Sequence, residues 1–160
     1  MSTDGSGLAA ETKVETPEGA MAIRTVVGKA IAVFSREPMG RVRFRMMHNV
    51  RKVGEQQPVL TVALETGQSF RVAPTQVLFK KGLVECQAEA LQVGDVLEPA
   101  FTYPDGYQFT DDRGGNERVS DAGLRVSSVA SGGTADIYSL GVHPTGNFFL
   151  SAGVLCKAEP

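Results

Sequence analysis

The sequence predicts an all-β fold, and three of its features support this prediction. Runs of about four to eight residues rich in valine, isoleucine, threonine and phenylalanine are separated by glycine and proline along nearly the whole chain. Several of these runs alternate apolar and polar residues, which is the pattern of strands with one buried face. No stretch longer than about two helical turns has the apolar spacing of an amphipathic helix.

The first elements are expected to be short. Residues 1–6 are small and polar, and we expect a flexible leader or the remnant of a tag there. A strand over Glu11–Glu15 is followed by Thr16-Pro17-Glu18-Gly19, which predicts a turn because proline fixes φ and glycine accepts a positive φ. Residues 21–27 fit either a short helix or an irregular strand. An apolar strand is expected at Ala30–Phe34.

Two hairpins are predicted in the middle of the chain. The first joins Gln57–Leu64 to Gln68–Val72 through a Thr-Gly turn, and the second joins Val77–Phe79 to Leu83–Cys86 through Lys-Lys-Gly. The two faces of the first hairpin differ in hydrophobicity, and we expect the more apolar face to point inward. That face carries Leu60, Val62 and Leu64, whereas the opposite one carries Val59, Thr61 and Ala63.

The second half of the chain is expected to contain one helical turn, a long loop and four more strands. Ala88–Val93 fits a single helical turn. Thr102–Gly123 predicts a long loop, which in a compact domain is either functional or mobile. The strands are expected at Leu124–Ala130, Ile137–Val142, Phe148–Leu150 and Val154–Cys156.

Composition and charge disfavour several classes of protein. The chain has 160 residues, of which 42% are hydrophobic and 21% charged, as in one soluble domain. With 16 basic and 18 acidic residues, its net charge of -2 is unlike that of a protein that neutralises a nucleic-acid backbone. No apolar run reaches the roughly 18 residues of a membrane span. Cys86 and Cys156 are far apart and indicate no disulfide framework, so we expect a cytoplasmic protein.

One local charge bias departs from this average. Arg41, Arg43 and Arg45 alternate with apolar residues, so their side chains are expected about 7 Å apart on one face of a strand. Such a row could follow a phosphate backbone. We favour a solvated face that protects an edge strand from wrong pairing, because the total charge is acidic.

The residue types by themselves predict no catalytic centre. The only histidines are His48 and His143, and no CxxC or HxxxH pair indicates a metal site. The sequence also lacks a glycine-rich loop followed by Lys-Ser or Lys-Thr, and it lacks Gly-x-Ser-x-Gly. We therefore expect neither a metal nor an organic cofactor.

Four groups of segments nevertheless occur in a distinctive order. They are Leu8–Gly19; Pro58–Leu64 with Arg71–Leu78; Leu91–Leu97; and Ile137–Val142 with Asn147–Phe149 and Gly153–Leu155. In this order they resemble the sequence blocks of the Hint superfamily, which includes hedgehog autoprocessing domains, inteins and bacterial intein-like domains. The resemblance covers one domain over residues 7–158. It implies a flattened horseshoe of β-strands with pseudo-twofold symmetry, and autocatalytic peptide-bond cleavage or protein splicing as the family activity.

The resemblance also identifies the positions that carry the family's upstream chemistry. The nucleophile, a cysteine or serine, stands five residues before the threonine that matches Thr12, and that position is Gly7. Glycine has no side chain with which to attack a carbonyl. The Thr-x-x-His motif that activates the scissile amide matches Ala73 and Gln76, and glutamine cannot shuttle a proton. When Gly7→Cys, Ala73→Thr and Gln76→His are combined, we expect some thiol-dependent release of a reporter fused before residue 7.

The downstream positions differ from the family pattern in the same way. An aspartate of the family corresponds to Ser139, and the closing His-Asn pair corresponds to Lys157 and Ala158. Alanine has no amide that could cyclise and cut the backbone. We therefore expect a catalytically silent binding or structural module. The alternative is a self-cleaving domain that was inactivated by engineering or that uses unusual nucleophiles.

Four residues are the nearest candidates for an unusual nucleophile or base, namely Ser6, Thr12, His143 and Cys156. In the family fold the closing strand is expected to run beside the opening one, which would place the Cys156 thiol near Gly7. A thiol there would be reactive only if its pKa were lowered. We favour a buried apolar cysteine.

A binding module needs a recognition surface, and the long loop Thr102–Gly123 is one candidate for contact with a protein partner. It contains Tyr103, Tyr107 and Phe109 among polar residues. A disordered insertion is the alternative, because the loop is rich in glycine and acidic residues. The sequence identifies no particular partner.

Overall fold

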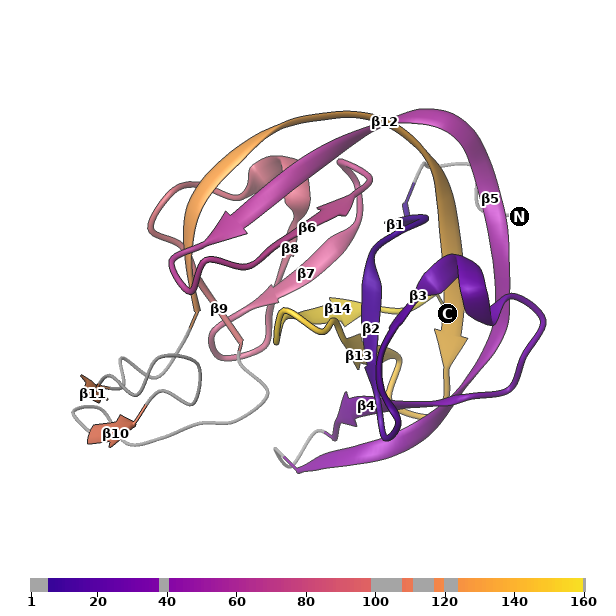
Figure 1. Ribbon diagram of the computed structural model, residues 1–160, viewed down its shortest axis with the longest axis horizontal. Helices are drawn as coiled ribbons and strands as arrows, with labels where there is room; N and C mark the ends of the chain where they lie inside the picture. The colour runs from indigo at the N-terminus through magenta and orange to yellow at the C-terminus, as the bar shows by residue number, and fades with distance from the viewer. Residues whose placement is uncertain (1–5, 38–40, 99–107, 111–116, 120–123, 160) are drawn as a thin grey trace.

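The computed structural model describes residues 6–37, 41–98, 108–110, 117–119 and 124–159. Strands dominate these residues (Figure 1), which confirms the predicted all-β fold. No helix within these ranges is long and apolar enough to span a membrane. Of the leader expected at residues 1–6, residues 1–5 lie outside the described residues, whereas Ser6 is described. The expected loop Thr102–Gly123 also lies outside the described residues, apart from two short strands, β10 (Gln108–Thr110) and β11 (Glu117–Val119), which pair with each other.

Two long antiparallel strands form the frame of the fold. β5 (Val42–Leu64) and β12 (Leu124–Val142) pair along most of their length, and Figure 1 shows them arching together over the other strands. The register between them shifts at five places. Bulges of this kind increase the local twist and bend a strand pair. The long pair therefore curves around the domain instead of forming a flat ribbon.

The shorter strands lie within this curve. On one side are β6 (Ser69–Val72), β7 (Val77–Lys80), β8 (Val84–Gln87), the 3-10 helix η2 (Ala88–Ala90) and β9 (Val96–Leu97). On the other side are β2 (Lys13–Thr16), β3 (Gly19–Ala22), the 3-10 helix η1 (Ile23–Val26) and β4 (Ala32–Arg36). Between them, β1 (Leu8–Ala9) pairs with both β12 and β6, while β14 (Leu155–Lys157) pairs with β7 and with β13 (Asn147–Phe149).

Predicted strands that were separated by turn signals are continuous in the structure. Arg41–Met46 and Gln57–Leu64 fall almost entirely within β5, and Leu124–Ala130 and Ile137–Val142 both fall within β12. The residues between them bend the strands without ending them. Backbone hydrogen bonding across the long pair continues through these bends, and single-strand patterns cannot reveal such pairing.

Gln56 shows how a bend in β5 is held. Asn49 and Gln56 adopt φ values of 56° and 48°, a conformation that few residues other than glycine take. The backbone N–H of Gln56 donates to Asp136 Oδ1 at 3.2 Å, and its side-chain Oε1 accepts from Thr134 Oγ1 at 3.2 Å. Side chains of β12 thus hold the bend in β5.

Both predicted hairpins are present, β5–β6 and β7–β8. In the second hairpin, β8 begins at Val84 rather than Leu83, because Leu83 adopts φ 63° in the turn. The predicted inward face of the first hairpin is confirmed, since Val62 and Leu64 are buried and Leu60 packs against the same core. Val59 on the opposite face is also buried, in a second and smaller cluster.

The remaining short elements agree with the sequence patterns to within two or three residues. Residues 21–27, which fitted a helix or a strand, contain the end of β3 and then η1. The predicted Thr16–Gly19 turn joins β2 to β3, with the Thr16 hydroxyl donating to the Gly19 carbonyl at 2.6 Å. Ala88–Val93 contains the single helical turn η2. β4 begins at Ala32, two residues later than expected.

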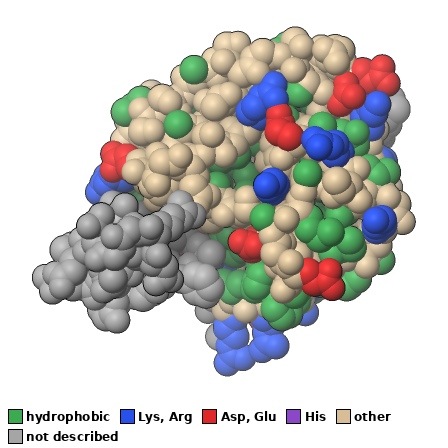
Figure 2. Space-filling view, viewed as in Figure 1, with side chains coloured by type: hydrophobic (Ala, Val, Ile, Leu, Met, Phe, Trp, Pro, Cys, Tyr) green, Lys and Arg blue, Asp and Glu red, His purple; other side chains and the backbone are tan. Residues whose placement is uncertain are grey.

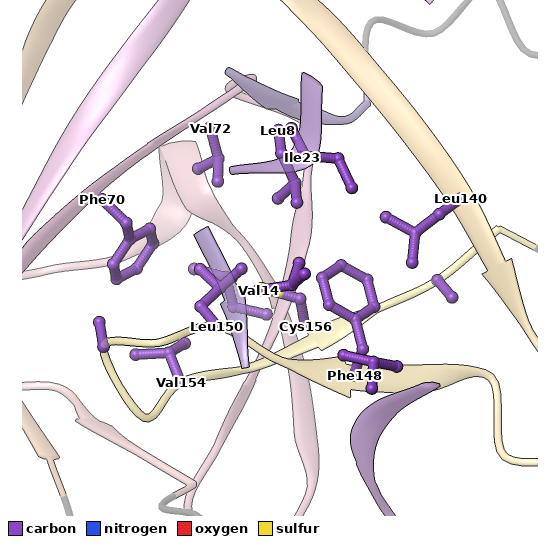
Figure 3. Packing of buried hydrophobic residues seen from close by; sticks show 14 of the residues in the cluster. Leu8, Val14, Ile23, Phe70, Val72, Leu140, Phe148, Leu150, Val154 and Cys156 are labelled. Atoms are coloured by element: carbon purple, nitrogen blue, oxygen red, sulfur yellow. The ribbon is translucent and has the colours of Figure 1, made fainter. Parts of the chain in front are cut away.

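The main core lies where the two sets of short strands meet. Figure 3 shows side chains from β1, β2, β6, β12, β13 and β14 converging on one region. It includes Leu8, Val14, Phe70, Val72, Leu140, Phe148, Leu150, Val154 and Cys156. Because residues from both ends of the chain complete this core, the N- and C-terminal strands are held together in the centre of the molecule.

We expect Phe148→Ala to lower the free energy of unfolding by about 3–5 kcal/mol, because it removes a side chain that is 1% exposed from the main core. Urea unfolding followed by circular dichroism measures this loss. Phe44→Ala is the matched control, since Phe44 is 53% exposed, and it should cost clearly less. Equal losses for the two variants would contradict the placement of the core.

Candidate functional site

A cavity of about 240 Å³ lies where the two ends of the chain approach each other. It is lined by Ser6, Leu8, Gln76, Val77, Tyr138, Ser139, Leu140, Phe148, Lys157, Ala158 and Glu159. Four of the six positions matched to the family's active residues are in this lining. Of the other two, Gly7 lies between two lining residues, and its carbonyl accepts a 3.0 Å hydrogen bond from the Ala73 N–H. The structure therefore brings all six positions together.

Strand pairing explains this convergence. Leu8 of β1 pairs with Tyr138 of β12 and with Val72 of β6. Cys156 of β14 pairs with Leu78 of β7. The sequence resemblance named residues from both ends and the middle of the chain, and these pairings place the corresponding backbone segments around one cavity.

At Gly7 the structure leaves no room for a side chain. The glycine is buried and has φ 148°, a value that L-residues rarely adopt. A Cβ atom there would lie 2.3 Å from Ile137 Cγ2 and 2.7 Å from the Tyr138 carbonyl oxygen. Ile137 therefore fills the space into which a nucleophilic side chain at residue 7 would extend.

The side chain of Gln76 is engaged in holding two backbone carbonyls. It is buried, and its Nε2 donates to the carbonyl oxygen of Lys157 at 2.9 Å and to that of Val77 at 3.0 Å. An amide nitrogen carries two hydrogens, so both are used. Gln76 thus ties β14 to β7 and has no hydrogen left to donate to the peptide bond before Gly7.

The side chains of Ser6, Thr12 and Lys157 have separate partners. The Ser6 hydroxyl lies 3.2 Å from Thr75 Oγ1 and 3.3 Å from the Thr75 carbonyl oxygen. Thr12 is buried, and its hydroxyl donates to the Arg71 carbonyl at 2.6 Å. The Lys157 ammonium points out to Glu85, with both carboxylate oxygens at 3.1 Å.

The cavity lining also includes the carboxylate of Glu159, which the sequence patterns did not single out. Arg51 contacts it with both terminal nitrogens, at 2.5 Å and 2.9 Å. Ser139 Oγ donates to it at 3.2 Å and Asn49 Nδ2 at 3.1 Å. The hydrogen bond from Arg51 is the largest cause that lowers the pKa of Glu159. Because these groups come from distant parts of the chain, no local pattern could have indicated them.

Cys156 is far less suited to nucleophilic chemistry than the sequence allowed. Cys156 is fully buried, and burial raises the pKa of its thiol, so the thiolate is disfavoured. The expectation that the closing strand runs beside the opening one is wrong, because β14 pairs with β7 and β13 and not with β1. His143 is exposed, and its ring stacks on that of His48.

The predicted arginine row is partly neutralised by one acidic residue. Arg43 Nε and Arg45 Nη2 lie 3.1 Å and 2.5 Å from the same oxygen of Glu37. Figure 2 shows acidic and basic side chains interspersed over one face of the molecule, with a group of basic side chains at its lower edge. Two of the three arginines therefore share one counter-charge.

Comparison with solved structures assigns the fold. A DnaB intein from Synechocystis sp. PCC 6803 superposes with a TM-score of 0.74 and 10% sequence identity, over 97% of this chain and 99% of that chain. The DnaX mini-intein from Spirulina platensis gives a TM-score of 0.70 at 12% identity, over 94% and 98% of the two chains. The PabCDC21-1 intein gives 0.71 at 18% identity, over 96% and 98%.

These likenesses define the class of structure to which the chain belongs: it has the Hint fold, and within that fold it is similar to inteins. The predicted horseshoe architecture is thereby confirmed. No protein-family model matches the sequence, and comparison with curated proteins finds no significant match.

Substituting Gly7→Ala is expected to cost about 2–4 kcal/mol of folding free energy, because it combines a strained φ with a collision against Ile137. Gly67→Ala is the control, since Gly67 has φ 91° but no atom within 4 Å of the added Cβ, and it should cost about 1 kcal/mol. A double-mutant cycle by urea unfolding should show that Ile137→Ala relieves Gly7→Ala by about 1 kcal/mol and leaves Gly67→Ala unchanged. Strict additivity at Gly7 would contradict the collision.

The ion pair of Glu159 should make stability depend on pH in one direction. Its folded pKa lies below the ordinary value of 4.5, so its contribution is fully present above about pH 4.5 and is lost as the pH falls through the lower, folded pKa. Relative to the natural chain, Glu159→Gln should be less stable by about 1 kcal/mol at pH 7, and this difference should shrink on acidification.

Urea unfolding of both proteins between about pH 7 and pH 3 measures this difference. Glu18→Gln, at an exposed glutamate of the β2–β3 turn, is the control and should show little difference at any pH. If the deficit of Glu159→Gln stayed constant across the range, the ion pair would not be its cause.

Proposed function

We propose that this chain is a Hint-fold module that does not cleave peptide bonds and that serves a binding or structural role. The observation that carries the proposal is the packing at residue 7. There, Gly7 offers no nucleophile, and Ile137 occupies the space where the side chain of a nucleophile would lie. The acyl shift that begins upstream cleavage needs a nucleophile at this position, so its absence closes the route instead of slowing it.

The other positions of the site support the same proposal. Gln76 uses both of its amide hydrogens on the carbonyls of Lys157 and Val77, and glutamine cannot act as a general acid or base. Ala158 has no side-chain amide to cyclise, and its backbone N–H donates to the Gly146 carbonyl at 2.9 Å. Gln76 and Ala158 therefore contribute hydrogen bonds to the fold at positions that an active family member would use for chemistry.

The contacts of Glu159 favour retention of the segment after residue 158. Besides the ion pair with Arg51, the backbone N–H of Glu159 donates to the Leu140 carbonyl at 3.0 Å. In a self-cleaving domain the residue after the closing asparagine belongs to the released segment. Here it is part of the folded domain. A module that keeps its terminal segments docked suits a structural or binding role.

A fused reporter should report the absence of cleavage directly. We expect reporters placed before Gly7 or after Ala158 to remain attached for days at neutral pH, with or without added thiol, as measured by intact mass. Cys156→Ala is the control, and it should leave this result unchanged because the thiol is buried in the core. Thiol-dependent loss of the upstream reporter that disappears in Cys156→Ala would refute the proposal and identify a displaced nucleophile.

Restoring the family's residue types tests whether packing at residue 7 also prevents cleavage. Combining Gly7→Cys, Ala73→Thr and Gln76→His supplies the family's residue types, but the new Cβ at residue 7 still meets Ile137. We therefore expect thiol-dependent release of the upstream reporter to be greater when Ile137→Ala is added to the three substitutions. Gel electrophoresis over time measures the release. Equal release with and without Ile137→Ala would show that Ile137 does not obstruct the site.

A further inference from the structure

The only two histidines of the chain form a stacked pair on the surface. His48 lies on β5 and His143 directly follows β12. Their ring centroids are 4.6 Å apart and their planes differ by 6°. The two residues are far apart in the sequence, so this pair exists only because β5 and β12 are neighbours in the sheet.

Gly141 makes this arrangement possible. In the register of the long pair, Gly141 stands opposite His48. A Cβ atom at Gly141 would lie 2.3 Å from His48 Cε1 and within about 3 Å of both ring nitrogens, so the ring occupies the space that a side chain at residue 141 would need. Since side chains alternate along a strand, His143 is two residues from Gly141 on the same face, where its ring meets that of His48.

Both imidazoles can be reached from solvent. His48 and His143 are exposed, and His143 also lines a second cavity of about 710 Å³ that contains Glu85 and Glu159. The stack therefore differs from a pair of histidines fixed inside a core. A metal ion lies in the plane of each imidazole that binds it, so both rings must turn out of the parallel stack to share one ion, and exposed side chains are free to change rotamer in this way.

We propose that His48 and His143 form a two-histidine surface site for a transition-metal ion, with Cu²⁺ as the preferred ion. Neutral imidazole is a common ligand of Cu²⁺, Ni²⁺ and Zn²⁺ in proteins, and for a given set of nitrogen ligands Cu²⁺ binds most strongly. Among the residues that the structure describes, no group of three or more histidine, cysteine, aspartate or glutamate side chains could hold a metal. The two imidazoles would thus bind the ion in an open site whose other positions are taken by water.

Binding at this pair would bridge the two strands that frame the fold. The unfolded chain does not hold His48 and His143 together, so an ion bound by both favours the folded state. An ion bound by one histidine alone would gain no such preference, because a single imidazole is equally available in the unfolded chain. Thermal stability therefore distinguishes the bridging site from adventitious binding.

The test titrates the full chain with copper sulfate at about pH 7.5, where imidazole is mostly neutral. Calorimetry measures stoichiometry and affinity, and circular dichroism measures the unfolding temperature with and without the metal. We expect one strong site per chain and a rise in the unfolding temperature. His48→Gln and His143→Gln should each weaken binding at least about tenfold, since even the loss of an outer partner of a ligand costs about 10- to 100-fold. Each should also abolish the thermal shift.

Two controls separate the pair from other ligands. Cys86→Ser removes the half-buried thiol and should leave both binding and the thermal shift unchanged. Gly141→Ala is expected to displace the His48 ring and to weaken binding while keeping both histidines. Zinc chloride in place of the copper salt should give the same pattern with lower affinity. The proposal is overturned if either single-histidine variant binds Cu²⁺ as tightly as the natural chain, or if the natural chain shows no thermal shift.

Discussion

The pairing of β5 with β12 is the constraint on which the rest of the structure depends. These two long strands bind each other through bulges that curve the pair, and Gln56 of β5 is held at its bend by Thr134 and Asp136 of β12. The curve encloses the shorter strands and allows β1 and β14 to enter the centre of the molecule. Without the bulges a 23-residue strand would extend well beyond a domain of this size, and the two chain ends would not meet.

The cavity between the chain ends combines a familiar architecture with an unfamiliar set of contacts. Three side chains in or beside the cavity make structural contacts. Ile137 fills space beside Gly7, Gln76 ties β14 to β7, and Glu159 is held by Arg51. The proposed silent role rests on these packing contacts and hydrogen bonds.

The sequence predicted the fold class because that class depends on local periodicity. Local sequence carries this information, as in the alternation over Gln57–Leu64, the Thr-Gly turn and the absence of long helical patterns. These patterns involve neighbouring residues, so they predict the same strands and turns whatever the tertiary contacts. The burial of Val62 and Leu64 followed from the same alternation. The burial of Val59 did not, because it depends on a second cluster with Ile137 that only the pairing of distant strands creates.

What the sequence determined by itself, therefore, was the all-β class, most of the short strands and turns and, through resemblance, which positions to compare around one cavity. The contacts that individual side chains make were decided by the tertiary structure alone. No reading of residue types could place Ile137 2.3 Å from a Cβ at Gly7, join Arg51 to Glu159, or stack His48 on His143. The physical reason is that each contact joins residues far apart in the sequence, at least one of which lies on the long strand pair, so that the contact depends on the register of that pair. That register is set by bulges whose position depends on the packing of both strands at once.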